Sequence, residues 1–118
     1  MKVKEFNKDK GQSAEALAVE YLKKQKYKIL ETNYSNKLGE IDIIARDKDK
    51  LTTVFIEVKY RTSDYFGLPR EAVGEYKQRK LRQVAMGYMV AHDLLEERVR
   101  FDVIDILSGQ ITHIKNAF

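Results

Sequence analysis

Two acidic side chains and one lysine stand in an otherwise apolar part of the sequence. Asp42 lies in the stretch Glu-Ile-Asp-Ile-Ile-Ala, and Glu57 and Lys59 lie in Val-Phe-Ile-Glu-Val-Lys-Tyr. Both stretches read as strands, and because side chains alternate between the faces of a strand, Glu57 and Lys59 are predicted to share one face with Phe55. Charges in such a setting are costly unless they are paired or bind a metal. These three residues are therefore the first candidates for chemistry.

A hairpin turn predicted at residues 47–50 would bring the acidic residues together. It sets Asp42 across from about Phe55 or Ile56, within a residue or two of Glu57. Two converging carboxylates repel each other unless a cation lies between them. Mg²⁺ suits this position, because it prefers oxygen ligands and usually binds one or two carboxylates together with waters and phosphates. With a lysine beside it, such a site suits phosphodiester hydrolysis.

A structural interpretation of the same residues stays open at this point. Asp42 and Lys59 would then form a cross-strand ion pair, worth about 0.2–1 kcal/mol. Charges on a half-exposed sheet face are common in antiparallel sheets. Spacing alone does not separate the two interpretations, since Asp, Glu and Lys are frequent residues.

Hydrophobic periodicity predicts the elements that must position these residues. We expect helices over residues 10–25 and 71–95, and strands over residues 27–34, 40–46, 51–60, 100–107 and 110–114. Asp9 and Gln12 have the spacing of a capping box for the first helix. The apolar face of the second helix is predicted to carry Leu81, Val84, Ala85, Tyr88, His92 and Leu95.

The order of these elements predicts a mixed α/β layer fold. The first three strands form a meander and should pair antiparallel, whereas the later strand–helix–strand crossover requires a parallel pair. No linker or repeat divides the chain, so its 118 residues are expected to form a single domain, 1–118.

Composition excludes several classes of site and of protein. Lys and Arg number 22 and Asp and Glu 18, giving a formal charge of +4, and there is no Cys. A disulfide framework, a thiolate zinc site and a cysteine nucleophile are thereby excluded. His92 and His113 lack metal-ligand spacing, so a metal would need oxygen ligands, which favours Mg²⁺ or Mn²⁺. With no apolar run of ~20 residues and no signal peptide visible, we expect a cytoplasmic protein without membrane association.

These motifs resemble those of a known group of nucleases. Gly-Glu-Ile-Asp-Ile-Ile-Ala at 39–45 and Val-Phe-Ile-Glu-Val-Lys-Tyr-Arg at 54–61 are similar to the core of the PD-(D/E)xK restriction-endonuclease-like superfamily. More narrowly, the chain resembles the uncharacterised bacterial YraN-like family, which is related to archaeal Holliday-junction resolvases. Further matches are Gly11, Glu15, Asn33, Phe66-Gly67, Pro69, Glu71-Ala72-Val73, Lys77-Gln78, Lys80-Leu81, Arg100-Phe101-Asp102-Val103 and residues 114–118. Ile41 stands where the superfamily has Pro, and residues 34–37 lack the Arg that relatives often carry there.

The resemblance implies a three-layer fold and a metal-dependent endonuclease acting on DNA, branched or junction DNA included. It implies that Asp42 and Glu57 bind Mg²⁺ or Mn²⁺, that Lys59 is the catalytic lysine, and that Glu15 brings a further acid from the first helix. From the residues alone, Glu15 is interpreted as an ordinary acid in the first turn of a helix, where the helix dipole favours it. Glu40 is either an accessory acid or a charge at the strand edge.

A basic surface is predicted beside these acids. Arg61 follows the Glu-x-Lys box, and Lys77 and Lys80 open the second helix, where they are candidates for phosphate contacts. Gln78 resembles a helix position that assists the site in related nucleases. A solvated helix face would carry the same charges.

By resemblance, a homodimer would match the two-fold symmetry of a four-way junction. The alternative function is a protein that retains the nuclease fold but binds nucleic acid without cleaving it, or an adaptor in DNA repair, recombination or uptake.

Overall fold

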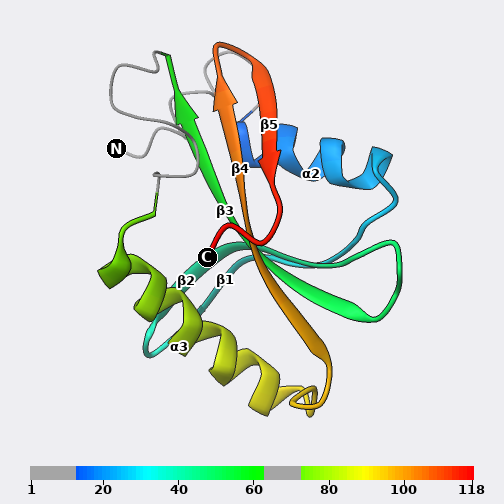
Figure 1. The fold of residues 1–118 in the computed structure, drawn as a ribbon, viewed down its shortest axis with the longest axis vertical. Helices are drawn as coiled ribbons and strands as arrows, with labels where there is room; N and C mark the ends of the chain where they lie inside the picture. Colours follow the sequence, from blue (N-terminus) through cyan, green and yellow to red (C-terminus); the bar gives the residue numbers. More distant parts are fainter. Residues whose placement is uncertain (1–12, 63–72) are drawn as a thin grey trace.

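A five-stranded mixed sheet with one helix on each face forms the fold, as expected from the sequence (Figure 1). The computed structural model describes residues 13–62 and 73–118. Its elements in chain order are α2 (Ala14–Lys24), β1 (Lys28–Asn36), β2 (Gly39–Arg46), β3 (Thr52–Arg61), α3 (Glu75–Ala91), β4 (Arg98–Leu107) and β5 (Gln110–Ile114). Within these ranges, no helix is long and apolar enough to cross a membrane.

The strands lie in the sheet in their order along the chain, from β1 to β5. β1, β2 and β3 form the predicted antiparallel meander. β3 and β4 pair in parallel over their whole length, and β5 returns antiparallel along β4. The predicted crossover is therefore confirmed, with α3 as its helix.

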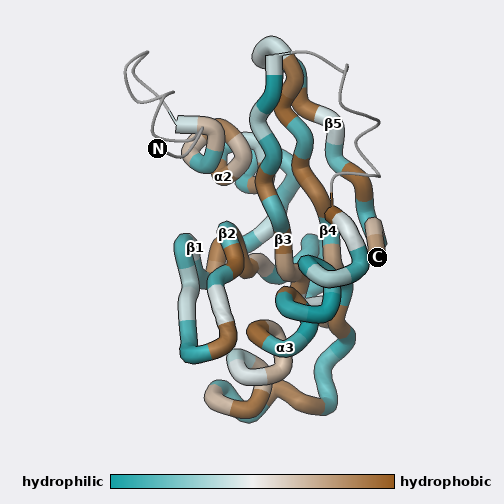
Figure 2. Tube along the Cα trace, turned by 90° about the vertical axis from the view of Figure 1, so that its left-hand side faces the viewer, coloured by the Kyte–Doolittle hydropathy of each residue, from teal (hydrophilic) through white to brown (hydrophobic). Residues whose placement is uncertain are grey.

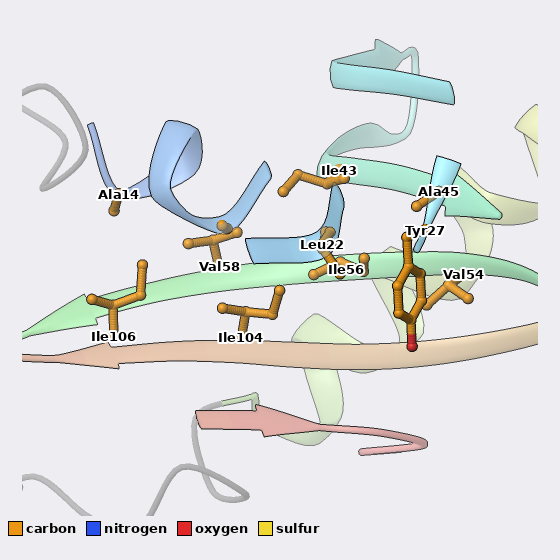
Figure 3. Packing of buried hydrophobic residues seen from close by; sticks show 11 residues of the cluster. Ala14, Leu22, Tyr27, Ile43, Ala45, Val54, Ile56, Val58, Ile104 and Ile106 are labelled. Carbon is orange, nitrogen blue, oxygen red and sulfur yellow. The ribbon is translucent and has the colours of Figure 1, made fainter. Parts of the chain in front are cut away.

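Alternating side chains divide the apolar core between the two faces of the sheet. On the α2 face, Leu22 packs among isoleucines and valines of β2, β3 and β4 (Figure 3). On the α3 face, Val84 and Tyr88 pack with Phe55 and Phe101. Figure 2 shows hydrophobic stretches along both β3 and β4, and the first seven residues of β3, 52–58, are all buried. Because β3 is buried on both faces, any charge it carries needs a partner.

Local signals set both ends of α2. Ser13 is its N-cap, and the Ser13 hydroxyl accepts a hydrogen bond from the backbone N–H of Ala16 at 3.1 Å. The helix ends where Lys26 adopts a left-handed conformation with φ of 73°. The capping box predicted at Asp9 and Gln12 lies outside the described residues.

The prediction that α3 continues to residue 95 is wrong. The helix ends at Ala91 and His92 is its C-cap, followed by Asp93 with a left-handed φ of 57°. His92 is consequently exposed rather than part of the core, and Leu95 is 58% exposed. The reversal of the chain at Asp93 ends the helical pattern, although apolar residues continue at helical spacing beyond it.

Candidate active site

The acidic pair lies where β2 and β3 separate. Ile44 pairs with Phe55 and Ile43 with Ile56, and no further pair of this ladder extends toward Asp42. Asp42 and Glu57 are the next residues on their strands, which corrects the prediction that Asp42 lies across from Phe55 or Ile56. The true register improves the predicted convergence, because it sets the two acids at the same step of the sheet.

At this point the Asp42 side chain, rather than the backbone of β2, bonds to β3. Asp42 Oδ2 accepts a hydrogen bond of 2.8 Å from the backbone N–H of Val58, so a side chain replaces the carbonyl that a continuing strand would supply. Asp42 is only 6% exposed. The alternation of side chains along β2 is broken here: Ile41 packs in the core on the α3 face, as Ile44 does, whereas Ile43 packs on the α2 face. β2 has left β3 by residue 41 and pairs with β1 alone, so it no longer follows the plane of the central strands.

Glu57 is buried, and two lysine ammonium groups lie beside its carboxylate. Glu57 Oε2 lies 3.6 Å from Lys59 Nζ and 3.3 Å from Lys77 Nζ. Burial raises the pKa of Glu57, and the charge of nearby Asp42 raises it further. The two lysines lower the pKa in part, but it stays above its ordinary value. A positive charge added beside the Glu57 carboxyl would therefore stabilise its ionised form.

Glu15 reaches the same region from α2. It is 8% exposed, and its Oε1 accepts a hydrogen bond of 2.5 Å from Asn33 Nδ2. Asn33 has a left-handed φ of 54°, a conformation that Asn tolerates better than most residues. The β1–β2 pairs on either side of Asn33, at Thr32 and Tyr34, set it across from Asp42. Asn33 thus links the helix acid to the strand position beside the acidic pair.

The arrangement suits a cation that completes its shell with water. Among residues 13–62 and 73–118, no three Asp, Glu or His side chains lie close enough together to form a ready metal-binding cluster. The register instead brings Asp42 and Glu57 together, with Glu15 connected through Asn33. Two carboxylates with water in the other positions is the usual arrangement for Mg²⁺ in proteins.

The predicted nucleic-acid contacts have partners inside the protein. Arg61 Nε donates to buried Asp105 at 2.8 Å, so this guanidinium joins β3 to β4. Gln78 Nε2 donates to the carbonyl of Val73 at 2.9 Å and holds the chain that leads into α3. Lys80 Nζ lies 5.8 Å from the centre of the Tyr76 ring. Their contacts with phosphates stay predictions.

The outlying acid Glu40 lies apart from the ladder between β2 and β3. It is exposed and pairs in register with Ser35 on β1, two residues beyond the point where β2 leaves β3. This position is consistent with a charge at the strand edge, and its role as an accessory acid stays a prediction.

The contact between Lys77 and Glu57 was not predicted from the sequence. Lys77 was predicted to bind nucleic acid, but the structure brings its ammonium to the acidic site. The predicted topology could have indicated this contact, because a helix that follows a strand in a parallel crossover begins near the carboxyl end of that strand. Lys77 belongs to the first turn of α3, and Glu57 lies in the carboxyl-terminal half of β3.

The buried polar network around Asp102 was also not predicted from the sequence. His113 Nε2 lies 2.7 Å from Asp102 Oδ2, and His113 Nδ1 lies 3.1 Å from the Tyr21 hydroxyl. Arg100 reaches Asp102 from the other side, with Nε 2.9 Å from Oδ1. Tyr21 is far from both residues in sequence, so no local spacing could indicate the contact.

Comparison with known proteins gives a consistent family. The profile of the uncharacterised protein family UPF0102 matches residues 14–106, which include all four residues predicted for catalysis. A UPF0102 protein of Geobacter metallireducens is 48% identical over 116 residues, covering 95% of this chain and 93% of the relative. UPF0102 proteins of Persephonella marina and Clostridioides difficile are 43% and 46% identical, and this chain covers 96% and 98% of their lengths. The chain therefore belongs to the UPF0102 family.

Proposed function

We propose that this protein is a Mg²⁺-dependent phosphodiesterase that cleaves DNA, with branched DNA among its substrates. One observation carries the proposal: two buried carboxylates, Asp42 and Glu57, occupy the same step at the point where β2 and β3 separate. Burial, and after it the charge of Asp42, raises the pKa of Glu57 even though two lysines lie beside its carboxylate, so added positive charge would stabilise its ionised form. Such a pair favours a divalent cation.

The donor set fits Mg²⁺ or Mn²⁺. Asp42 and Glu57 would hold the cation through carboxylate oxygens, and Glu15 would add a third acid. When bound, the cation supplies a water of lowered pKa and neutralises charge on the phosphate. Asn33 would fix the orientation of Glu15 through their hydrogen bond.

Lys59 would act on the water or the transition state. Its ammonium stands 3.6 Å from Glu57 and is about one-third exposed, so it lies at the boundary between the buried acids and solvent. From there it can hydrogen-bond an attacking water or a non-bridging phosphate oxygen. Lys77 and Lys80, in the first two turns of α3, would contact phosphates outside the scissile bond.

A cleavage assay tests the proposal directly. Branched, single-stranded and duplex DNA are each incubated with the protein and Mg²⁺ or Mn²⁺. We expect Asp42→Asn and Glu57→Ala to lose more than the roughly 10–100-fold that follows loss of an outer-shell partner. Glu20→Gln is the matched control, since Glu20 is an exposed acid on α2 whose partner is Lys24 at 3.7 Å.

The outcomes separate the two candidate functions. Cleavage that persists unchanged in both site variants, or no cleavage of any substrate, contradicts the enzymatic proposal. Metal-independent binding of branched DNA without cleavage would instead support the alternative of a binding or adaptor protein that retains the fold. Molar mass measured with and without a four-way junction tests the proposed homodimer.

A further inference from the structure

Two lysines from different elements compete for one oxygen of Glu57. Lys59 comes from β3 itself, and Lys77 comes from the first turn of α3. Both ammonium groups contact the same atom, Oε2, and Lys77 is the nearer, at 3.3 Å against 3.6 Å. A cation that binds this oxygen therefore competes with both ammonium groups for it.

Lys77 is the lysine that can leave. Its side chain is 50% exposed, whereas that of Lys59 is 36% exposed. Lys59 belongs to the central ladder, where its backbone is in register with Asp105 of β4. Lys77 lies in a helix turn, where its long side chain can extend to solvent without any change in the backbone. A lysine in the first turn also gains nothing from the helix dipole, which favours acids there.

The backbone around Lys77 is held in place. The side-chain amide of Gln78 donates to the carbonyl of Val73, and the backbone N–H of Gln78 donates to the carbonyl of Gly74 at 2.9 Å. Val73 is itself buried, with 5% exposure. The first turn of α3 is thus anchored to the core, and only the side chain of Lys77 needs to move.

We propose that Lys77 is an internal counter-ion of the site: it neutralises Glu57 while no metal is bound, and moves to a DNA phosphate when a divalent cation takes its place. This rests on the proposed function and adds a form of regulation to it. Metal binding and phosphate binding are then coupled through one side chain. The ammonium that opposes the metal in the free protein assists the substrate once the metal is bound.

Metal affinity measured without DNA is the first test. Mn²⁺ binding is followed by calorimetry and by electron paramagnetic resonance for the unmodified protein, Lys77→Gln and Lys24→Gln. Loss of one partly exposed ion-pair partner should tighten Mn²⁺ binding about two- to fivefold in Lys77→Gln. Lys24→Gln removes the same charge from a lysine that pairs with Glu20, and should leave the affinity unchanged. Asp42→Asn should abolish this binding.

Salt dependence of DNA binding is the second test, with Ca²⁺ as a probe cation. For Lys77→Gln, the slope of log K against log[salt] should fall by about one when Ca²⁺ is present. Without a divalent cation the slope should not change, because Lys77 then stays on Glu57.

The outcomes distinguish this inference from the proposed function. Equal or weaker Mn²⁺ binding by Lys77→Gln, together with loss of binding in Asp42→Asn, overturns the counter-ion role and leaves the nuclease proposal standing. A slope change that is the same with and without Ca²⁺ also overturns it, since Lys77 would then be an ordinary phosphate contact. If the unmodified protein binds no Mn²⁺, both proposals fail.

Discussion

Glu57 is held between opposing electrostatic influences. Burial and the Asp42 carboxylate favour its neutral form, while Lys77 and Lys59 favour its charged form. The first two prevail, so the pKa of Glu57 is higher in the folded protein than in the unfolded chain. Between these two pKa values the native state binds more protons than the unfolded state. The contribution of Glu57 to stability is therefore lost as pH rises through the folded pKa.

A neutral residue at this position should stabilise the protein at neutral pH. For Glu57→Gln we expect a higher free energy of unfolding at pH 7, because a carboxylate whose ionised form is disfavoured by burial and by Asp42 is replaced by a neutral amide of the same shape. The gain should shrink as pH falls toward the ordinary pKa of a glutamate, about 4.3. Urea unfolding at pH 4 to 8 measures it.

Glu20→Gln serves as the control for this measurement, because Glu20 is an exposed acid that pairs with Lys24 on the surface of α2. A Glu57→Gln variant that is less stable than the unmodified protein at pH 7 would mean that the ion pairs with the lysines dominate. The acidic cluster would then be structural.

At the scale of single residues, the sequence identified the acids but not their neighbours. The apolar setting of Asp42 and Glu57 is visible in the sequence, and both are buried. The contact of Asn33 with Glu15 depends on a left-handed residue inside a strand, which no alternation pattern indicates. Lys77 was predicted to bind nucleic acid, and its contact with Glu57 was missed because the two residues lie on opposite sides of the crossover in sequence.

At the scale of elements, α3 is fitted against the β1–β2 turn, which lies beside it in Figure 1. Asn36 Nδ2 donates to the carbonyl of Val84 at 3.2 Å, in the middle of the helix. A Cβ added at Gly87 would stand 2.8 Å from the same Nδ2. A side chain at position 87 would therefore have to move the Asn36 amide.

Gly87→Ala should fail to give the usual gain of a helix-interior alanine, which is about 1 kcal/mol. The added methyl group must displace the Asn36 amide, and the lost hydrogen bond costs about as much. We expect a net effect of zero or a destabilisation, measured by thermal and urea unfolding.

The matched test places the same change in an Asn36→Ala background. There Gly87→Ala should stabilise by about 1 kcal/mol, because no side chain remains to be displaced. Equal effects in the two backgrounds would show that the hairpin and the helix are not coupled at this contact.

Element boundaries were harder to predict than element types. All strands and both described helices lie where periodicity indicated them. The end of α3 was missed because Leu94 and Leu95 continue the apolar spacing after the backbone has reversed at Asp93. Periodicity reports which side chains are apolar, whereas the end of a helix depends on backbone conformation.

At the scale of the whole molecule, one buried polar network joins the layers. Asp102 on β4 is fully buried and accepts hydrogen bonds from His113, Arg100 and the backbone N–H of Asn116. Arg100 also contacts Asp47 in the β2–β3 turn and the Tyr27 hydroxyl. Burial opposes ionisation of Asp102, but the hydrogen bonds outweigh it, led by that from His113, and lower its pKa. The network is a feature of the folded state only.

Acid should therefore weaken the fold through Asp102. Because its pKa is lower in the folded than in the unfolded state, its contribution is complete above the ordinary aspartate pKa of about 3.9 and is lost as pH falls through the folded pKa. Asp102→Asn should destabilise by about 3 kcal/mol at pH 7. Between pH 5 and pH 2, this variant should also lose less stability than the unmodified protein does.

Circular dichroism at a series of pH values measures this loss. Part of the acid dependence should remain in the variant, because the pKa of Asp49 is also lowered, by the backbone N–H of Leu51. An acid dependence identical to that of the unmodified protein would exclude Asp102 as a source.

The strand order has a consequence for how the protein is made. β1, β2 and β3 are neighbours in both sequence and sheet, so they can pair as they leave the ribosome. All ten residues of β3 then lack their parallel partner strand until β4, which begins only at Arg98, is available. During synthesis of the intervening chain, a long apolar edge is open to other nascent chains, and such edges promote aggregation. Lys77 belongs to the same intervening chain, so until α3 folds onto the sheet Glu57 has only Lys59 of its own strand beside it.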